Sequence, residues 1–149
     1  MTEFLETTVD KFIFRVAIDR FYNDQGVWVK EEDGNVRVGL SDFVQQRNGD
    51  VAFAEIKPVD TNLVFGDDLA EIETIKVNIT FTSPVTGKVI EINPAMQDAP
   101  EAINQDPYGE GWLAIIKPFD WTTDLARLRD PQTYFARMRT EAEEEAKKP

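Results

Sequence analysis

The stretch Ile75-Lys76-Val77-Asn78-Ile79-Thr80-Phe81-Thr82 (residues 75–82) alternates apolar and polar side chains without a break. Successive side chains of a β-strand point to opposite faces, so the odd-numbered residues predict a buried face and the even-numbered ones a solvent face. The segment therefore predicts a half-buried strand with Lys76 on its solvent side. Upstream, Leu69 and Ile72 do not keep the phase of this segment throughout, which predicts a turn of the chain close to Lys76.

Short strands and turns are also predicted on both sides of this segment. Residues 83–88 (Ser-Pro-Val-Thr-Gly-Lys) predict a bend that leads into a strand at 89–92. Residues 27–30 and 35–39 flank Asp33-Gly34, a dipeptide that favours a type I′ hairpin turn. From Val51 onward Pro and Gly residues interrupt short apolar runs, and no amphipathic crossover helix separates the strands. We expect a mainly β fold, a flattened barrel or sandwich with short helices.

The same patterns predict a strand and two helices outside this region. Residues 12–18 alternate as a strand would. Ser41 can cap a helix over 42–47 that ends at Asn48-Gly49. The pair Asp130-Pro131 starts a C-terminal helix that extends to Ala146. Its apolar stripe is short, and the polar stretch 141–149 is expected to fray or to stand in solvent.

Composition excludes several classes of function. The 149 residues suit a single domain, and 28 Asp and Glu residues outnumber 16 Lys and Arg residues, giving a net charge of −12. This charge repels nucleic acids and anionic membranes. The sequence contains no Cys and no His, which excludes thiol nucleophiles, Cys/His zinc sites and His-based catalysis. No apolar stretch is long enough to span a membrane and the first residues are acidic, so we expect a cytoplasmic protein.

The clustered carboxylates are weak candidates for chemistry. The pairs Asp67-Asp68 and Glu71/Glu73 and the run Glu31-Glu32-Asp33 lie in predicted turns or at alternating strand positions, where acidic residues ordinarily keep an edge soluble. Residues 98–106 lack the central Gly of a calcium loop. We therefore expect no catalytic residue and no metal site.

The sequence around Lys76 indicates the function of this residue. Taken alone, a lysine near a hairpin tip is most often a solubilising charge. Here Glu73-Thr74-Ile75-Lys76 is followed by Ser83-Pro84-Val85-Thr86-Gly87 and then by Asn104 to Leu113, which includes Asp-Pro-Tyr-Gly-Glu-Gly-Trp. In this order the three motifs resemble those of the H protein of the glycine cleavage system, a family of lipoyl carriers. The resemblance covers about residues 26 to 130.

The resemblance implies a lipoyl-domain fold and a cofactor-bearing carrier in place of an enzyme. It implies that lipoic acid is attached through an amide to Lys76 and that Glu73 helps the lipoylating enzyme to recognise the hairpin. The implied partners are a lipoate ligase or lipoyl transferase, dihydrolipoamide dehydrogenase and the enzymes that the lipoyl arm visits. We expect one lipoyl-carrier domain over 1–149, with a core at about 12–120, a helical extension at about 121–149 and a monomeric state.

Departures from the family pattern leave the cargo open. Family members usually carry His-Glu-Trp where this chain has Gly26-Val27-Trp28, and the Ala-Ala-Ser that usually follows the lysine is Val77-Asn78-Ile79 here. These departures favour similarity to the lipoate-binding proteins that serve a heterodisulfide-reductase-like complex in sulfur oxidation, where the arm carries sulfur intermediates. The alternative is the H protein itself, carrying an aminomethyl group. A different class of function, an unmodified interaction module, also stays open, whereas biotin carriage is disfavoured because biotin domains usually have Met on both sides of the lysine.

Overall fold

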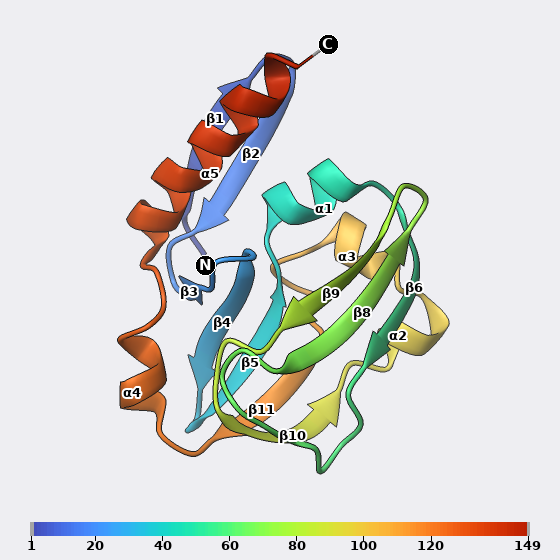
Figure 1. Ribbon diagram of the computed structural model, residues 1–149, viewed down its shortest axis with the longest axis vertical. Coiled ribbons are helices and arrows are strands. Elements are labelled where there is room, and N and C mark those ends of the chain that lie inside the picture. Colours follow the sequence, from blue (N-terminus) through green and yellow to red (C-terminus); the bar gives the residue numbers. More distant parts are fainter. Residues whose placement is uncertain (1, 149) are drawn as a thin grey trace.

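The computed structural model describes residues 2–148 as two facing β-sheets with a separate hairpin and helix at one side (Figure 1). The strands are β1 (Phe4–Val9), β2 (Phe12–Ala17), β3 (Phe21–Tyr22), β4 (Val27–Glu32), β5 (Asn35–Leu40), β6 (Val51–Ile56), β7 (Asn62–Leu63), β8 (Asp68–Thr74), β9 (Asn78–Thr82), β10 (Gly87–Ile92) and β11 (Ala114–Pro118). The helices are α1 (Asp42–Asn48), α2 (Ala95–Asp98), α3 (Ala102–Gln105), α4 (Trp121–Leu125) and α5 (Pro131–Ala146).

All strand pairs described in the three sheets are antiparallel. One sheet has the order β3-β4-β5-β11-β10-β7 and the other the order β6-β8-β9, whereas β1 and β2 pair only with each other. The prediction of a mainly β sandwich is confirmed. Among residues 2–148 no helix has the length and apolar character needed to cross a membrane.

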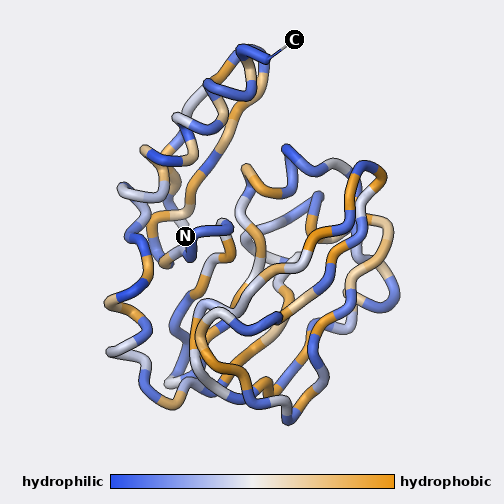
Figure 2. The backbone as a smooth tube through the Cα atoms, in the orientation of Figure 1, coloured by the Kyte–Doolittle hydropathy of each residue, from blue (hydrophilic) through white to orange (hydrophobic). Residues whose placement is uncertain are grey.

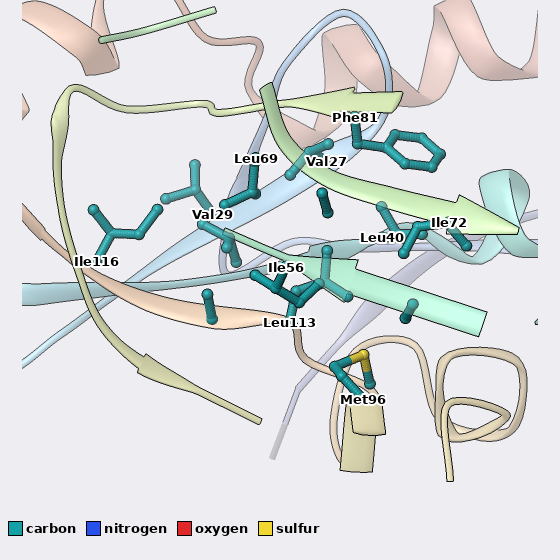
Figure 3. Packing of buried hydrophobic residues seen from close by; sticks show 14 of the residues in the cluster. Val27, Val29, Leu40, Ile56, Leu69, Ile72, Phe81, Met96, Leu113 and Ile116 are labelled. Carbon is teal, nitrogen blue, oxygen red and sulfur yellow. The ribbon is translucent and has the colours of Figure 1, made fainter. Parts of the chain in front are cut away.

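The two larger sheets enclose a cluster of mainly aliphatic side chains, which we call the sheet core (Figure 3). Its members include Val27, Val29, Leu40, Ile56, Leu69, Ile72, Phe81, Met96, Leu113 and Ile116. Most of them come from strands of both sheets, whose alternate residues point inward, while Met96 comes from α2 and Leu113 from the residue before β11. Burying this apolar surface is the main force that holds the sandwich together.

Local sequence signals set several of the turns as predicted. Asp33 and Gly34 both have positive φ, 53° and 84°, as a type I′ turn between β4 and β5 requires. Ser41 caps α1 by accepting a hydrogen bond from the Val44 N–H, and Gly49 ends it at φ 83°. The strand predicted at 89–92 is β10, and it begins two residues earlier, at Gly87.

A second cluster, which we call the hairpin core, packs the β1–β2 hairpin against α5 and the adjoining edge of the sandwich. Its buried members are Val9, Phe14, Val16, Tyr22, Trp28, Phe43, Tyr134, Met138 and Ala142. The rings of Tyr22 and Tyr134 stack with centroids 4.3 Å apart. The strand predicted at 12–18 is β2, and its partner β1 was not predicted.

The expectation that residues 141–149 fray or stand in solvent is borne out in part: side chains such as Glu143 and Glu144 are exposed, but the stretch does not fray before Ala146. Helix α5 continues to Ala146, and Ala142 is buried against the hairpin. Arg47 of α1 forms ion pairs with both Glu141 and Glu145. The helix persists because its sparse apolar face meets a hairpin that supplies the missing contacts. Residue 149 lies outside the described residues.

Candidate carrier site at the tip of the β8–β9 hairpin

The turn that carries Lys76 is made by residues 75–77, which join β8 to β9. The two strands are paired up to Glu73 and Asn78. The prediction of a turn close to Lys76 is confirmed. The prediction of a strand beginning at Ile75 is wrong, because β9 begins at Asn78. Residues 75–77 continue the apolar and polar alternation of β9 but lie beyond the end of the sheet.

Thr74 holds the turn together. Its backbone N–H donates to the Val77 carbonyl at 2.8 Å, and its hydroxyl donates to the same carbonyl at 3.1 Å. The hydroxyl oxygen also accepts hydrogen bonds from the N–H groups of Lys76 and Val77, each at 3.1 Å. A threonine hydroxyl that bonds to the backbone two and three residues ahead is a known turn former. This signal was present in the sequence and could have identified Thr74 as a site residue.

The tip is also tied to the loop that follows α1. The Ile75 N–H donates to the Asp50 carbonyl at 3.1 Å. Gly49, next to Asp50, lies beside the tip, since a Cβ built there would be in ordinary van der Waals contact with it, 3.4 Å from Ile75 Cγ1 and 3.6 Å from Lys76 Cε. The lysine side chain therefore leaves the hairpin across the C-terminal end of α1.

The side chains of the tip are exposed, although two of the three are apolar. Ile75 is 72% exposed and Val77 42% exposed, and apolar residues mark the tip in Figure 2. The odd-numbered face expected to be buried reaches the sheet core only at Phe81, which is 3% exposed, with Ile79 partly buried. The hairpin extends beyond the core, so its last residues have no facing sheet to cover them.

The Lys76 amine is available for modification. Its side chain is exposed, and among residues 2–148 no carboxylate lies within 4.0 Å of its nitrogen. The contacts that fix the turn are made by the backbone of Lys76 and by Thr74. Acylation of the amine would thus disturb no internal hydrogen bond, and the tip fits a covalently attached acyl group.

Glu73 lies at the end of β8 with its side chain exposed. It is paired in register with Asn78 on β9 and with Phe53 on β6. Phe53 is itself 54% exposed, so an acidic group and an apolar ring lie together below the tip. The structure places Glu73 near Lys76, as the sequence predicts, on a surface that another protein can reach.

The other acidic candidates do not gather into a site. Asp67 caps a local turn by accepting the Val64 N–H at 2.7 Å, and Glu71 is exposed on the outer face of β8, in register with Glu55. Glu31 and Glu32 lie at the end of β4, just before the β4–β5 turn. Within residues 2–148 no three potential metal-ligating side chains come together.

The segment that departs from the family pattern, Gly26-Val27-Trp28, is packed inside the molecule. Val27 is fully buried. A Cβ at Gly26, where φ is 82°, would lie 2.6 Å from both the Tyr134 hydroxyl and a methyl group of Val44. The Tyr134 hydroxyl is 2.7 Å from Ser41 Oγ, and burial raises the pKa of Tyr134, which keeps it neutral. Helix α5 thus occupies the space that a side chain at position 26 would need.

Comparison with known proteins gives the lysine hairpin a family context. The family profile described as "Glycine cleavage H-protein" matches residues 20–141, most of the chain. The chain belongs to the glycine cleavage H-protein family. The proteins of this family are non-catalytic carriers that serve partner enzymes and hold a lipoate covalently on a lysine.

Individual relatives agree with this assignment. The glycine cleavage system H protein of Idiomarina loihiensis is 40% identical over 122 residues, covering 81% of this chain and 94% of the relative. That of Thermus thermophilus is 38% identical, covering 83% and 96%. The crystal structure of a glycine cleavage system H protein from Mycobacterium marinum superposes with a TM-score of 0.66 at 31% identity, covering 68% of this chain and 85% of that one.

These relatives are named for glycine cleavage, so the predicted closeness to the sulfur-oxidation branch stays a prediction. The family match begins at residue 20 and therefore leaves out β1 and β2, which end at Ala17. It ends at residue 141, so the last turn of α5 also lies outside it.

Proposed function

We propose that this protein is a lipoyl carrier whose lipoate is attached through an amide to Lys76. The observation that carries the proposal is an exposed lysine, with no carboxylate partner among residues 2–148, held at the tip of a well-fixed hairpin in a chain of this family. A lipoyl group supplies a dithiolane that opens to a dithiol and carries a bound group between active sites. The Thr74 hydrogen bonds fix where the tether starts, and the exposed tip leaves the tether free to enter another protein.

Glu73 and the apolar side chains of Ile75 and Val77 form the recognition surface in this proposal. A lipoate ligase or lipoyl transferase must bind the tip for a short time and then leave. A small contact of one charge and two exposed apolar residues suits a transient complex. Dihydrolipoamide dehydrogenase would meet the same surface when it reoxidises the arm. We treat the whole chain as one monomeric carrier domain.

Lipoylation in a defined system tests the assignment. Wild-type protein incubated with lipoate, ATP and a lipoate ligase should gain the mass of one lipoyl group, located at Lys76 by peptide mass spectrometry. Lys76→Arg should gain none and keep its fold, because a guanidinium forms no lipoyl amide. Glu73→Ala should be modified more slowly with an unchanged melting temperature, and Glu71→Ala, on the same face of β8, is the matched control. Lipoate found on Lys57 or Lys88 instead would contradict the proposal.

The aminomethyl group of glycine cleavage is the cargo best supported for the arm, because the relatives carry that name. Mixing the lipoylated protein with glycine and a glycine decarboxylase should then add an aminomethyl group to the arm, detected by intact mass. A protein that stays unloaded while the relative from Thermus thermophilus is loaded under the same conditions would contradict this cargo.

Transport of sulfur intermediates to a heterodisulfide-reductase-like complex is the second candidate. The observation that favours it is the buried Val27 and the filled space at Gly26, which leave no acidic group where the family usually carries His-Glu-Trp. An amine cargo would lack that acidic partner. Turnover of the reduced, sulfur-loaded arm by such a complex, without loading by glycine decarboxylase, would support this candidate.

A further inference from the structure

The third sequence motif, residues 104–113, begins beside the short loop that joins α1 to β6. Asn104 lies in α3, and its side chain is hydrogen-bonded to α1, to the loop and to β6. Its Nδ2 donates to the Gln45 side-chain oxygen and to the Gly49 carbonyl, each at 3.1 Å. Its Oδ1 accepts the Val51 N–H at 2.9 Å. One side chain thus holds both ends of the loop.

The peptide that joins Asp50 to Val51 links Asn104 to the lysine hairpin. The part of the chain that the structure describes contains no cis peptide. A trans peptide is planar, and its C=O and N–H groups point in opposite directions. Asn104 binds the N–H of this peptide, and the Ile75 N–H donates to its carbonyl at 3.1 Å. A single rigid plane therefore connects Asn104 to the residue that precedes Lys76.

The pairing of β6 with β8 holds this end of β6 only weakly. Their register shifts between Val51 and Phe53, so the ladder is irregular where it approaches the tip. A bulge of this kind disrupts the ladder hydrogen bonds around it. Helix α1 has already ended, since Gly49 is its C-cap, and the Asp50 side chain is exposed. The Asn104 amide supplies hydrogen bonds that neither the ladder nor the helix provides here.

The residues that follow Asn104 anchor it to the body of the molecule. The Trp28 indole N–H donates to the Pro107 carbonyl at 3.0 Å, and Arg20 donates to the Tyr108 carbonyl at 3.0 Å. Both donors are buried, with Trp28 0% and Arg20 3% exposed. Asn104 therefore projects toward the loop from a fixed support.

We propose that Asn104 is a positioning residue for the acylation of Lys76. This inference rests on the proposed lipoylation of Lys76. By holding the Asp50–Val51 peptide, Asn104 keeps the Asp50 carbonyl where the Ile75 N–H can reach it, so the tip is ordered before a lipoylating enzyme binds it. Ordering in advance lowers the entropic cost of binding. Loss of Asn104 weakens binding of the unmodified protein to the enzyme and leaves the chemical step unchanged.

Asn93 provides a matched control for Asn104. Its Nδ2 donates to the carbonyls of Glu110 and Trp112 at 2.7 and 2.8 Å, and its Oδ1 accepts the Ala95 N–H at 3.0 Å. Like Asn104, it donates twice and accepts once, and it supports the same motif. Its partners lie in the motif and in α2, away from the loop before β6. Replacement of either residue by Ala removes the same kinds of hydrogen bond.

Lipoylation kinetics test the proposal. Unmodified protein is titrated into a lipoate ligase supplied with lipoate and ATP. Asn104→Ala should raise the KM for the protein about tenfold, equivalent to about 1.4 kcal/mol, the size of one hydrogen bond. Its kcat should change by less than about twofold, because saturating enzyme orders the tip. Asn93→Ala should leave KM and kcat within about twofold of wild type.

Hydrogen exchange in the unmodified protein tests the same link without lipoate. The Ile75 amide should exchange about tenfold faster in Asn104→Ala, because the tip opens locally once the Asp50 carbonyl is released. In Asn93→Ala this amide should exchange at the wild-type rate. If Asn104→Ala does not fold, Asn104→Asp and Asn93→Asp replace the pair, since each keeps the accepting oxygen and loses both donations. Asn104→Asp should then raise KM about fivefold, and Asn93→Asp less than about twofold.

The outcomes that overturn the inference are distinct from failure of the carrier assignment. Equal KM values for the Asn104 and Asn93 variants overturn it, and so does an Ile75 amide that keeps its wild-type exchange rate in the Asn104 variant. A fall in kcat at unchanged KM also overturns it, because the effect would then lie in the chemical step. All three leave the lipoylation of Lys76 intact. Wild-type protein that takes no lipoate at Lys76 overturns the proposed function and this inference with it.

Discussion

The β8–β9 hairpin and the β1–β2 hairpin are held in place by different forces. The tip at Lys76 is fixed by hydrogen bonds that its N–H groups donate to the Thr74 hydroxyl and the Asp50 carbonyl, and its apolar side chains are exposed. The β1–β2 hairpin is fixed by burial, with Val16 fully buried and Phe14 7% exposed against α5 and α1. A hydrogen-bonded tip can present a modified residue to other proteins, whereas a packed hairpin can only shape the surface beside it.

The largest loss of stability is expected when a buried side chain of the hairpin core is shortened. Met138 is 1% exposed in the hairpin core. Met138→Ala should destabilise the protein by about 2–5 kcal/mol, because it removes buried contacts and leaves a cavity. Urea unfolding measures the loss. Ile75→Ala, at 72% exposure, should change stability by less than about 0.5 kcal/mol. Equal losses in the two variants would contradict the distinction between the hairpins.

A smaller effect is expected at the hydrogen-bonded tip. Thr74→Val removes the hydroxyl that bonds to Lys76 and Val77 while keeping the side-chain volume. We expect a loss of about 1–2 kcal/mol and slower lipoylation, because the tip loses its fixed shape. Thr80→Val, on the exposed face of β9, is the control and should leave both quantities unchanged. Normal lipoylation of Thr74→Val would show that the ligase does not require an ordered turn.

The polar link between α5 and α1 should contribute about 1 kcal/mol. Tyr134→Phe removes the hydroxyl that lies 2.7 Å from Ser41 Oγ, and Ser41 still accepts the Val44 N–H afterwards. Urea unfolding should show this small loss. Hydrogen exchange should show faster opening of α5 with no change in β8 or β9. Faster exchange at the Lys76 tip would mean that the two hairpins are coupled through α1.

The smallest expected effect is a pH-dependent change in stability at the start of α5. The Thr133 N–H donates to the Asp130 carboxylate at 2.7 Å and holds the pKa of that carboxyl below its usual value. This stabilisation is present above the unfolded-state pKa, about 3.9, and is lost as the pH falls through the lower folded-state pKa. Asp130→Asn keeps a capping oxygen but does not titrate. The stability difference between wild type and Asp130→Asn should therefore shrink on acidification, and a constant difference would contradict the lowered pKa.

Short-range signals explain what could be predicted. The Asp33-Gly34 turn, the Ser41 cap and the end of α1 at Gly49 depend on residues a few positions apart, and all three were predicted. The Lys76 turn was predicted from a slip in alternation and from a family motif. Its boundary was misplaced because Ile75 and Val77 continue the apolar pattern of β9 beyond the sheet, where periodicity alone does not distinguish a buried residue from an exposed one.

Long-range packing explains what could not be predicted. Strand β1 and the last turn of α5 look weak in isolation, since neither has a complete apolar face. In the folded chain Val9 of β1 and Ala142 of α5 belong to one buried cluster with Phe43 and Tyr22 of the sandwich, residues far away in the sequence.

The amino-acid sequence by itself determined the class of fold, the turn at Lys76 and membership of a carrier family, because alternation, turn residues and motifs are local properties of the chain. Only the tertiary structure decided that Ile75 and Val77 are exposed, that α5 fills the space at Gly26 and that Asn104 holds the loop beside the lysine tip. Those features depend on which residues far apart in the sequence come into contact. The free energy gained by burying apolar surface selects these contacts, and it does not depend on the separation of the residues along the chain.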